Sequence, residues 1–119
     1  MGCIIVSPQD LVVYGWNGQP SGWDNVCEKE SSLARFTGEP SLLETLPTVL
    51  HAESNALMKA AREGFKLKGS SLFVTCSPCI DCAKLIHQAG ISKVYYHEEY
   101  RSTDGIDFLH KCGMGVELL

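Results

Sequence analysis

The sequence predicts an α/β domain in which helices are layered on a mostly parallel sheet that carries one antiparallel strand. Two short runs rich in β-branched residues stand at the start of the chain, and strand-like and helix-like segments alternate from residue 48 onward. The chain has 119 residues, of which 45% are hydrophobic and 20% are charged, so it can bury one compact core. It is too short for two ordinary domains.

The first two strands are predicted to form an antiparallel hairpin. GCIIV (residues 2–6) and LVVYGW (residues 11–16) are β-branched runs, and the SPQD segment between them is a turn-forming cluster. Residues 17–48 then show no persistent periodicity and are rich in Gly, Ser, Pro and charge. Connections of this length are normally functional or disordered, and we interpret this one as a partly ordered loop packed over a site.

A first helix is predicted in VLHAESNALMKAAREG, residues 49–64. Thr48 is the expected N-cap of this helix, and Gly64 is its expected stop. The positions expected to form a loose apolar stripe along it are Leu50, Ala56, Leu57, Ala60 and Ala61.

The rest of the chain is predicted to alternate between strands and helices. SLFVT is a short strand, and the next helix, CIDCAKLIHQAG, is expected to have Ser77 as N-cap, Pro78 in its first turn and Gly90 as stop. The last three elements are predicted as a strand in ISKVYY, a short helix in IDFLHKCG and a strand in MGVELL.

The net charge and the distribution of apolar residues limit the kinds of partner that this protein is expected to bind. A formal net charge of -4 and a pI near 5.5 weigh against contact with a polynucleotide, which usually needs a basic face, and favour a small substrate. No apolar run is long enough to span a membrane, and MGCIIVSPQD has neither the basic start nor the long apolar stretch of a secretory signal. We expect a cytoplasmic protein that does not contact a membrane.

Cysteines in a cytoplasmic protein are mostly reduced. The CxxC pair Cys79 and Cys82 is therefore a candidate metal site or redox pair rather than half of a disulfide framework. The other four cysteines are scattered, and we interpret them as buried, inert thiols: Cys3, Cys27, Cys76 and Cys112.

The strongest functional signal is the combination of His51 and Glu53 with this CxxC pair. Cys79 and Cys82 are three residues apart at the predicted start of a helix, so both side chains can coordinate one metal ion. His51 and Glu53 are two residues apart, which places them on nearly opposite sides of a helix, so they can share a site only at the first turn. The predicted geometry is two helix N-termini that point at one metal.

Three protein ligands leave the fourth position of a tetrahedral zinc ion open, which is typical of a catalytic rather than a structural site. Glu53 is then the candidate acid and base that moves protons between water and substrate. A lone HxE occurs often by chance, and a lone CxxC can be a redox pair or half of a structural zinc knuckle. The combined pattern H-x-E…P-C-x-x-C is typical of zinc-dependent nucleobase deaminases.

Longer segments resemble the deoxycytidylate (dCMP) deaminases of the cytidine and deoxycytidylate deaminase superfamily. The resemblance covers almost the entire chain, in GCIIV, YGWNGQPSGWDN, HAESNAL, TCSPCIDCAKLIHQAG and VYYHEEYRSTDGIDFLHKCGMGVEL. It implies a three-layer cytidine deaminase-like fold, with a mixed five-stranded sheet flanked by helices, in a single zinc-dependent deaminase domain over residues 1–119. It also implies one catalytic Zn²⁺ held by His51, Cys79 and Cys82, with Glu53 as the proton shuttle.

The reaction implied by this resemblance is the hydrolysis of dCMP to dUMP and ammonia, which supplies dUMP for thymidylate synthesis. The implied substrate contacts are Asn17 to the deoxyribose, with Asn55, Tyr100 and Arg101 near the phosphate. The implied effector loop, for dCTP as activator and dTTP as inhibitor, usually with Mg²⁺, contains Gly15, Trp16 and Gly18.

The resemblance also bears on assembly. Relatives usually begin with a helix that packs on the sheet, whereas this sequence starts almost at the first strand, so either the sequence is shortened at its start or the fold does without that helix. Family members commonly form hexamers, and some form dimers, so a homo-oligomer is implied.

Other interpretations stay open beside this one. The chain could act on another cytosine nucleoside or nucleotide or on tRNA adenosine, or it could be a catalytically silent zinc-binding module, although Glu53 argues against a silent module. Trp16 and Trp23 are interpreted as packing of the long loop, with nucleotide stacking as the alternative. The histidines outside the motif are interpreted as ordinary helix or surface residues: His87, His97 and His110.

Overall fold

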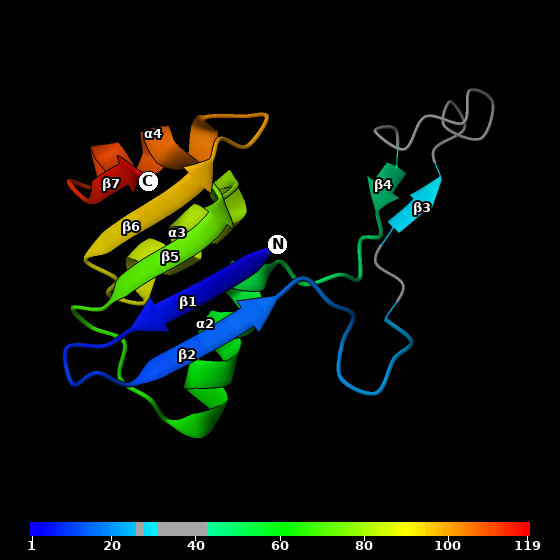
Figure 1. Ribbon diagram of the computed structural model, residues 1–119, viewed down its shortest axis with the longest axis horizontal. Coiled ribbons are helices and arrows are strands. Elements are labelled where there is room, and N and C mark those ends of the chain that lie inside the picture. Colours follow the sequence, from blue (N-terminus) through cyan, green and yellow to red (C-terminus); the bar gives the residue numbers. More distant parts are fainter. Residues whose placement is uncertain (26–27, 31–42) are drawn as a thin grey trace.

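The computed structural model describes residues 1–25, 28–30 and 43–119. Its main sheet has five strands in the order β2-β1-β5-β6-β7 (Figure 1). These strands are β1 (Gly2–Val6), β2 (Val12–Trp16), β5 (Ser71–Cys76), β6 (Lys93–Glu98) and β7 (Gly115–Leu118). Strand β1 runs antiparallel to β2 and β5, whereas β5, β6 and β7 are parallel. The prediction of a mostly parallel sheet with one antiparallel strand is confirmed.

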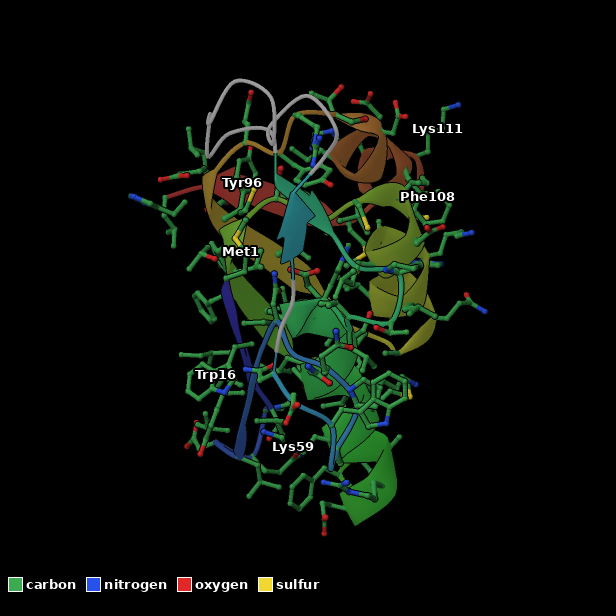
Figure 2. The ribbon with its side chains drawn as sticks, turned by 90° about the vertical axis from the view of Figure 1, so that its right-hand side faces the viewer. Met1, Trp16, Lys59, Tyr96, Phe108 and Lys111 are labelled. Carbon is green, nitrogen blue, oxygen red and sulfur yellow. The ribbon has the colours of Figure 1, made fainter. Side chains whose placement is uncertain are left out.

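The three helices of the described chain lie on one side of this sheet (Figure 2). They are α2 (Ala52–Glu63), α3 (Ile80–Gln88) and α4 (Asp104–Lys111). Helix α2 packs on β1 and β2 and contacts α3, which in turn contacts α4. The expected cytidine deaminase-like fold with a mixed five-stranded sheet is confirmed, but in the described residues all three helices cover one face, so two layers are present there rather than the expected three. None of the helices in the described chain is long and apolar enough to cross a membrane.

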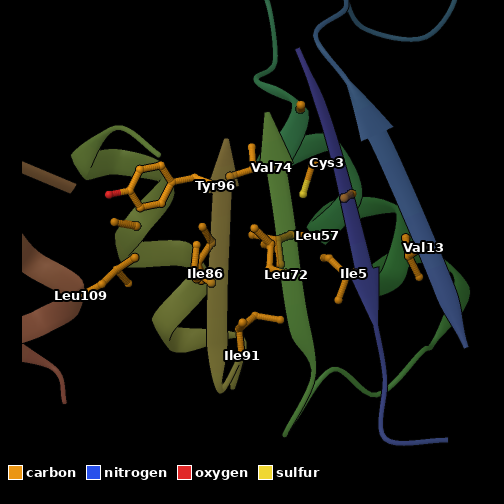
Figure 3. Close-up of a cluster of buried hydrophobic side chains, with 14 of the residues drawn as sticks. Cys3, Ile5, Val13, Leu57, Leu72, Val74, Ile86, Ile91, Tyr96 and Leu109 are labelled. Atoms are coloured by element: carbon orange, nitrogen blue, oxygen red, sulfur yellow. The ribbon is translucent and has the colours of Figure 1, made fainter. Parts of the chain in front are cut away.

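The core lies between the sheet and these helices. Alternate residues of the strands point into it, so Ile5, Leu72 and Val94 are fully buried. They pack with Ile86 of α3 and Leu109 of α4 in one continuous cluster (Figure 3). This packing fixes where the N-terminal ends of the helices lie relative to the sheet.

The opposite side of the sheet carries a row of large apolar side chains. Tyr14, Ile4, Phe73 and Tyr95 are neighbours in register across four adjacent strands. The rings of Phe73 and Tyr95 are stacked with centroids 4.8 Å apart, while Tyr14 and Ile4 are exposed. Trp16 lies on this side as well, away from the helices (Figure 2).

Gly15 allows α2 to lie directly against β2. A methyl group at this position would be 2.7 Å from both the Ala52 carbonyl oxygen and the Ala56 amide nitrogen. No larger residue fits without moving the first turn of α2, so Gly15 helps to fix the start of this helix.

Both predicted helix N-caps are wrong. Helix α2 begins three residues later than the Thr48 cap implied, with His51 as its N-cap, and α3 has Cys79 rather than Ser77 as its N-cap. The hydroxyls of Thr48 and Ser77 are used in other hydrogen bonds. The predicted stop of α2 is confirmed, because Gly64 is its C-cap with a φ of 75°. In the predicted stripe, Leu50 precedes the helix and Ala61 is exposed, while the other three residues are buried.

The long connection after β2 contains a small second sheet that the sequence did not predict. Strands β3 (Glu28–Glu30) and β4 (Leu43–Thr45) pair antiparallel, apart from the main sheet (Figure 1). Strands of three residues are too short to show an alternating apolar pattern. The predicted loop over residues 17–48 includes residues 26–27 and 31–42, which lie outside the described residues.

Candidate metal centre and active site

Three side chains converge at the N-terminal ends of α2 and α3. The Nδ1 atom of His51 lies 3.6 Å from Sγ of Cys79 and 3.5 Å from Sγ of Cys82. The three donor atoms all lie within 4.8 Å of one another, and no other group of three or more possible metal ligands occurs among the described residues. A tetrahedral zinc ion with ordinary Zn–N and Zn–S bonds separates such donors by about 3.6 Å. The donor set therefore fits zinc.

The backbone explains why two separate helices meet here. His51 and Cys79 are the N-caps of their helices, and their carbonyl oxygens accept the first helical hydrogen bonds, from Asn55 and Ala83, both at 2.9 Å. Neither side chain caps its own helix, so each can turn toward the other. The partial positive charge of the α3 N-terminus stabilises a thiolate in its first turn, where Cys82 lies.

Asn17 holds the start of α2 beside this cluster. Its Oδ1 atom accepts a hydrogen bond from the backbone N–H of Ala52 at 3.0 Å. Ala52 is the residue between His51 and Glu53, so this bond satisfies an N–H that the helix cannot pair internally. Asn17 follows β2 directly and therefore ties the metal ligand and the acid/base candidate to the sheet.

Glu53 lies buried beside the donor cluster, with 6% of its surface exposed. Burial raises the pKa of its carboxyl above the ordinary value, while a hydrogen bond from Cys82 and the nearby His51 oppose that rise. A raised pKa makes a carboxylate a stronger base, so it accepts a proton more readily before passing it on. The environment of Glu53 therefore suits a proton shuttle.

The thiol of Cys82 is held in a surrounding that disfavours charge. Burial raises its pKa, and the nearby Glu53 raises it further. Since metal ligands must be deprotonated, a bound cation is needed to keep this sulfur as a thiolate. The Oγ atom of Ser54 lies 3.5 Å from Sγ of Cys82, a neighbour that the sequence analysis did not identify.

The donor cluster opens into a surface pocket of about 280 Å³. Its lining is formed by Val49, Leu50, His51, Ser54, Cys79, Asp81, Cys82 and Leu85. A second pocket, of about 480 Å³, shares Leu50 with the first. Its lining is formed by Gly15, Trp16, Gln19, Pro20, Ser21, Leu50, Asn55, Met58, Lys59 and Arg62. Two residues of the expected effector loop, Gly15 and Trp16, thus line a pocket separate from the metal cluster.

The expected substrate contacts do not all meet at the metal cluster. Asn55 lines the larger pocket, and its Nδ2 group donates a 2.7 Å hydrogen bond to the Trp16 carbonyl. Tyr100 and Arg101 follow β6, and the guanidinium carbon of Arg101 lies 5.5 Å from the centre of the Tyr100 ring. Arg101 is exposed, and neither residue lines the two pockets.

The remaining candidates stand apart from the cluster. His87 is half-buried, and its ring forms a T-shaped pair with Phe108, with centroids 6.4 Å apart, whereas His97 and His110 are exposed. Trp23 is exposed as well.

Among the cysteines outside the CxxC pair, Cys3 is buried, and burial raises its pKa to about 12, as an inert thiol requires. Cys76 and Cys112 are free and half-buried, whereas Cys27 lies outside the described residues.

Gly105 lets α4 rest directly on the backbone that carries Cys79. A methyl group at position 105 would overlap the Pro78 carbonyl oxygen and would lie 2.9 Å from the carbonyl carbon and oxygen of Cys79. This role of Gly105 could not be predicted from the sequence, because a single glycine near the start of a predicted helix carries no distinctive signal.

Gly105→Ala should therefore weaken the metal site. Alanine normally stabilises a helix by about 1 kcal/mol relative to glycine. Here we expect a loss of about 2 kcal/mol in unfolding free energy and a lower zinc content, because the methyl group displaces the Cys79 backbone. Denaturant unfolding and metal analysis check this. Gly2→Ala is the control, because a methyl group there would meet no atom of residues 1–25, 28–30 or 43–119 within 4 Å. A Gly105→Ala protein as stable and as zinc-rich as the control would contradict the expectation.

Comparisons with known proteins agree with this geometry. The family model for the cytidine and deoxycytidylate deaminase zinc-binding region matches residues 1–98. Human deoxycytidylate deaminase is 39% identical over 103 residues, which cover 86% of this chain and 54% of the human protein. The deoxycytidylate deaminase of Enterobacteria phage T4 is 32% identical over 148 residues, covering 98% of this chain and 77% of the phage protein.

A solved structure extends the agreement to nearly the whole chain. The dCMP deaminase from the cyanophage S-TIM5, in complex with dCMP and dUMP, matches with a TM-score of 0.83 and 47% identity. The match covers 99% of this chain and 79% of that one. The chain spans about half the length of the human relative. Because the family model matches most of the chain and includes all three metal-site residues, the chain belongs to the cytidine and deoxycytidylate deaminase zinc-binding family.

Proposed function

We propose that this chain is a zinc-dependent deaminase that converts dCMP and water to dUMP and ammonia. The observation that carries the proposal is the buried Glu53 beside three converging metal donors, His51, Cys79 and Cys82. A structural zinc site needs no acid or base, and it usually has four protein ligands rather than three. The choice of dCMP is supported by the similar cyanophage enzyme, whose structure contains dCMP and dUMP. We take residues 1–119 as one such deaminase domain.

The chain's own groups account for the proton transfers. His51, Cys79 and Cys82 would hold the zinc ion, which would supply a Lewis acid that makes the attacking water more acidic. Glu53 accepts a proton from that water as oxygen bonds to C4 of the cytosine ring, and it delivers this proton to N3. Glu53 then moves the second proton to the amino group, so that the bond from C4 to that nitrogen breaks and ammonia leaves. Atoms balance as dCMP plus water giving dUMP plus ammonia.

We propose that residues in the loops around the metal donors bind the deoxyribose and the phosphate of dCMP. We assign Asn17 to the deoxyribose, since its side chain lies at the start of α2 beside the ligands. Arg101, with Tyr100, is assigned to the phosphate, because a guanidinium can pair with two phosphate oxygens. Asn55 is better assigned to the larger pocket, where its amide holds the Trp16 carbonyl.

We also propose that the larger pocket binds a nucleotide effector, dCTP or dTTP, with Mg²⁺. Lys59 and Arg62 supply positive charge, which suits a ligand with phosphates, and Trp16 at the end of β2 also lines this pocket. Leu50 lines both pockets and directly precedes His51. A ligand in the larger pocket can therefore shift the metal site through Leu50.

The cellular setting follows from the chemistry of the site. A pair of cysteines that binds metal has to be reduced, which favours a reducing compartment such as the cytoplasm. The proposed product, dUMP, is a precursor for thymidylate synthesis. We further propose a homo-oligomer, a hexamer or a dimer, by resemblance to the family.

The first experiment is a substrate panel with zinc-loaded protein. Separate incubations with dCMP, CMP, deoxycytidine and dCTP are followed by loss of the cytosine absorbance, and we expect dCMP alone to be converted efficiently. Equal conversion of deoxycytidine would instead indicate a nucleoside deaminase. No conversion of any substrate by protein that retains zinc would favour a silent zinc-binding module.

Glu53→Gln should abolish turnover while the protein keeps its zinc. The amide retains the size of the side chain but cannot accept or release a proton, so we expect kcat to fall by about 10²- to 10⁴-fold. Steady-state kinetics and metal analysis on the same preparation separate loss of chemistry from loss of metal. A Glu53→Gln protein with near-normal kcat would remove Glu53 from the proposed role.

Arg101→Ala should act on binding rather than on chemistry. Loss of a charge-assisted hydrogen bond is expected to raise the KM for dCMP by about 10- to 100-fold with little change in kcat. Lys111→Ala, which removes an exposed cation from the far end of α4, is the matched control. If both variants showed the KM of the unmodified protein, the phosphate would have to be bound elsewhere.

A further inference from the structure

We infer that Ser77 is a positioning residue for nucleotide recognition: its hydroxyl fastens the loop that carries Tyr100 and Arg101 to the loop that carries Cys79. The inference deepens the proposed function and rests on it, because the assignment of the phosphate to Arg101 belongs to that proposal. Ser77 does not itself touch the substrate, but it fixes the distance between a metal ligand, Cys79, and the proposed phosphate-binding residue, Arg101.

Two hydrogen bonds join Ser77 to the loop after β6. Its backbone N–H donates to the Glu98 carbonyl at 2.8 Å, and its Oγ atom accepts the backbone N–H of Tyr100 at 2.6 Å. The last paired residues of β5 and β6 are Cys76 and Glu98. The Ser77 side chain therefore extends the pairing of these strands by one step, at the point where the chain turns into Pro78.

Burial of Ser77 stabilises its hydrogen bond with the Tyr100 N–H. Ser77 is 2% exposed, and Tyr100 is half-buried. A hydrogen bond shielded from water is not easily exchanged for one to solvent, and an unpaired buried group is costly. The local sequence offers a second use for the hydroxyl, as an N-cap, but α3 starts at Ile80 and leaves Ser77 for Tyr100.

The other end of the same loop is fixed on the same backbone. Gly105 rests on the Pro78 and Cys79 carbonyls so closely that no larger side chain fits there. The segment between Tyr100 and Gly105, with Arg101 in it, is thus held at both ends by Ser77, Pro78 and Cys79. The metal ligand and the phosphate-binding candidate therefore share one rigid support.

Such a support matters for a nucleotide more than for a nucleoside. The base has to reach Glu53 and the metal, while the phosphate has to reach Arg101 at the same time. When the distance between two contacts is preset, binding loses less conformational freedom, and a small misplacement weakens both. Ser77 should therefore strengthen binding of ligands that carry a phosphate and have little influence on those that lack one.

The test is Ser77→Ala, with binding of dUMP and of deoxyuridine measured by calorimetry on zinc-loaded protein. We expect dUMP to bind about tenfold more weakly, deoxyuridine binding to change less than twofold, and the KM for dCMP to rise in parallel with the loss of dUMP affinity while kcat changes much less. Ser70→Ala is the matched control, since Ser70 is equally buried, lies next to the opposite end of β5 and has no hydrogen-bond partner for its hydroxyl among the described residues.

The possible outcomes separate the inference from the proposed reaction. Unchanged dUMP binding in Ser77→Ala would overturn the inference and leave the reaction intact. An equal loss for dUMP and deoxyuridine, together with lower zinc content, would also overturn it, because it would indicate general damage to the site. If the unmodified protein binds dUMP but does not deaminate dCMP, the proposed reaction fails, and a tenfold loss in Ser77→Ala would still support the positioning role.

Hydrogen exchange gives a direct physical readout. The Tyr100 amide should exchange more slowly in the unmodified protein than in Ser77→Ala, because the variant lacks its acceptor. Equal exchange rates at this amide would mean that the hydroxyl does not hold the loop, and the inference would then be overturned whatever the binding data show.

Discussion

Every part of the site depends on the meeting of two helix N-termini beyond the end of β5. His51 and Cys79 occupy the positions where extended backbone becomes helix, so their side chains can leave the helix axes and face each other. The packing of α2 and α3 on the sheet therefore sets the distances between the metal donors. Gly15 beneath α2 and Gly105 against Cys79 keep that packing close, since neither position has room for a methyl group.

Placing ligands at N-cap positions has an energetic consequence. A serine, threonine or aspartate N-cap stabilises a helix by about 1 kcal/mol, and neither His51 nor Cys79 provides that bond. For α2 the missing capping bond is partly replaced by Asn17, which lies 35 residues earlier in the sequence and whose Oδ1 atom accepts a hydrogen bond from the Ala52 N–H. A bound metal adds stability to the folded state alone, since the ligands are brought together only there.

Most of the sheet and the meeting of the three metal donors could be predicted from local patterns. The hairpin, the later alternation of strands and helices, and the Gly64 stop are all local signals, and each appears in the structure. His51 and Glu53 are two residues apart and can share a site only at the start of a helix. This spacing predicted that His51 would meet Cys79 and Cys82 at a helix N-terminus, as it does in the structure. By contrast, β3 and β4 are too short to leave a periodic pattern.

The features that could not be predicted depend on partners that are distant in the sequence. Thr48 and Ser77 are good N-cap residues by type, yet the hydroxyl of Thr48 donates to Gln19 and that of Ser77 accepts from Tyr100. The requirement for glycine at position 105 also depends on a distant partner, because only the folded chain places Gly105 against Pro78. Predictions from local sequence thus fail where residues near the metal donors form hydrogen bonds or close contacts with other loops. In this chain the exceptions to the local rules lie around the metal site, where a fixed geometry matters more than helix stability.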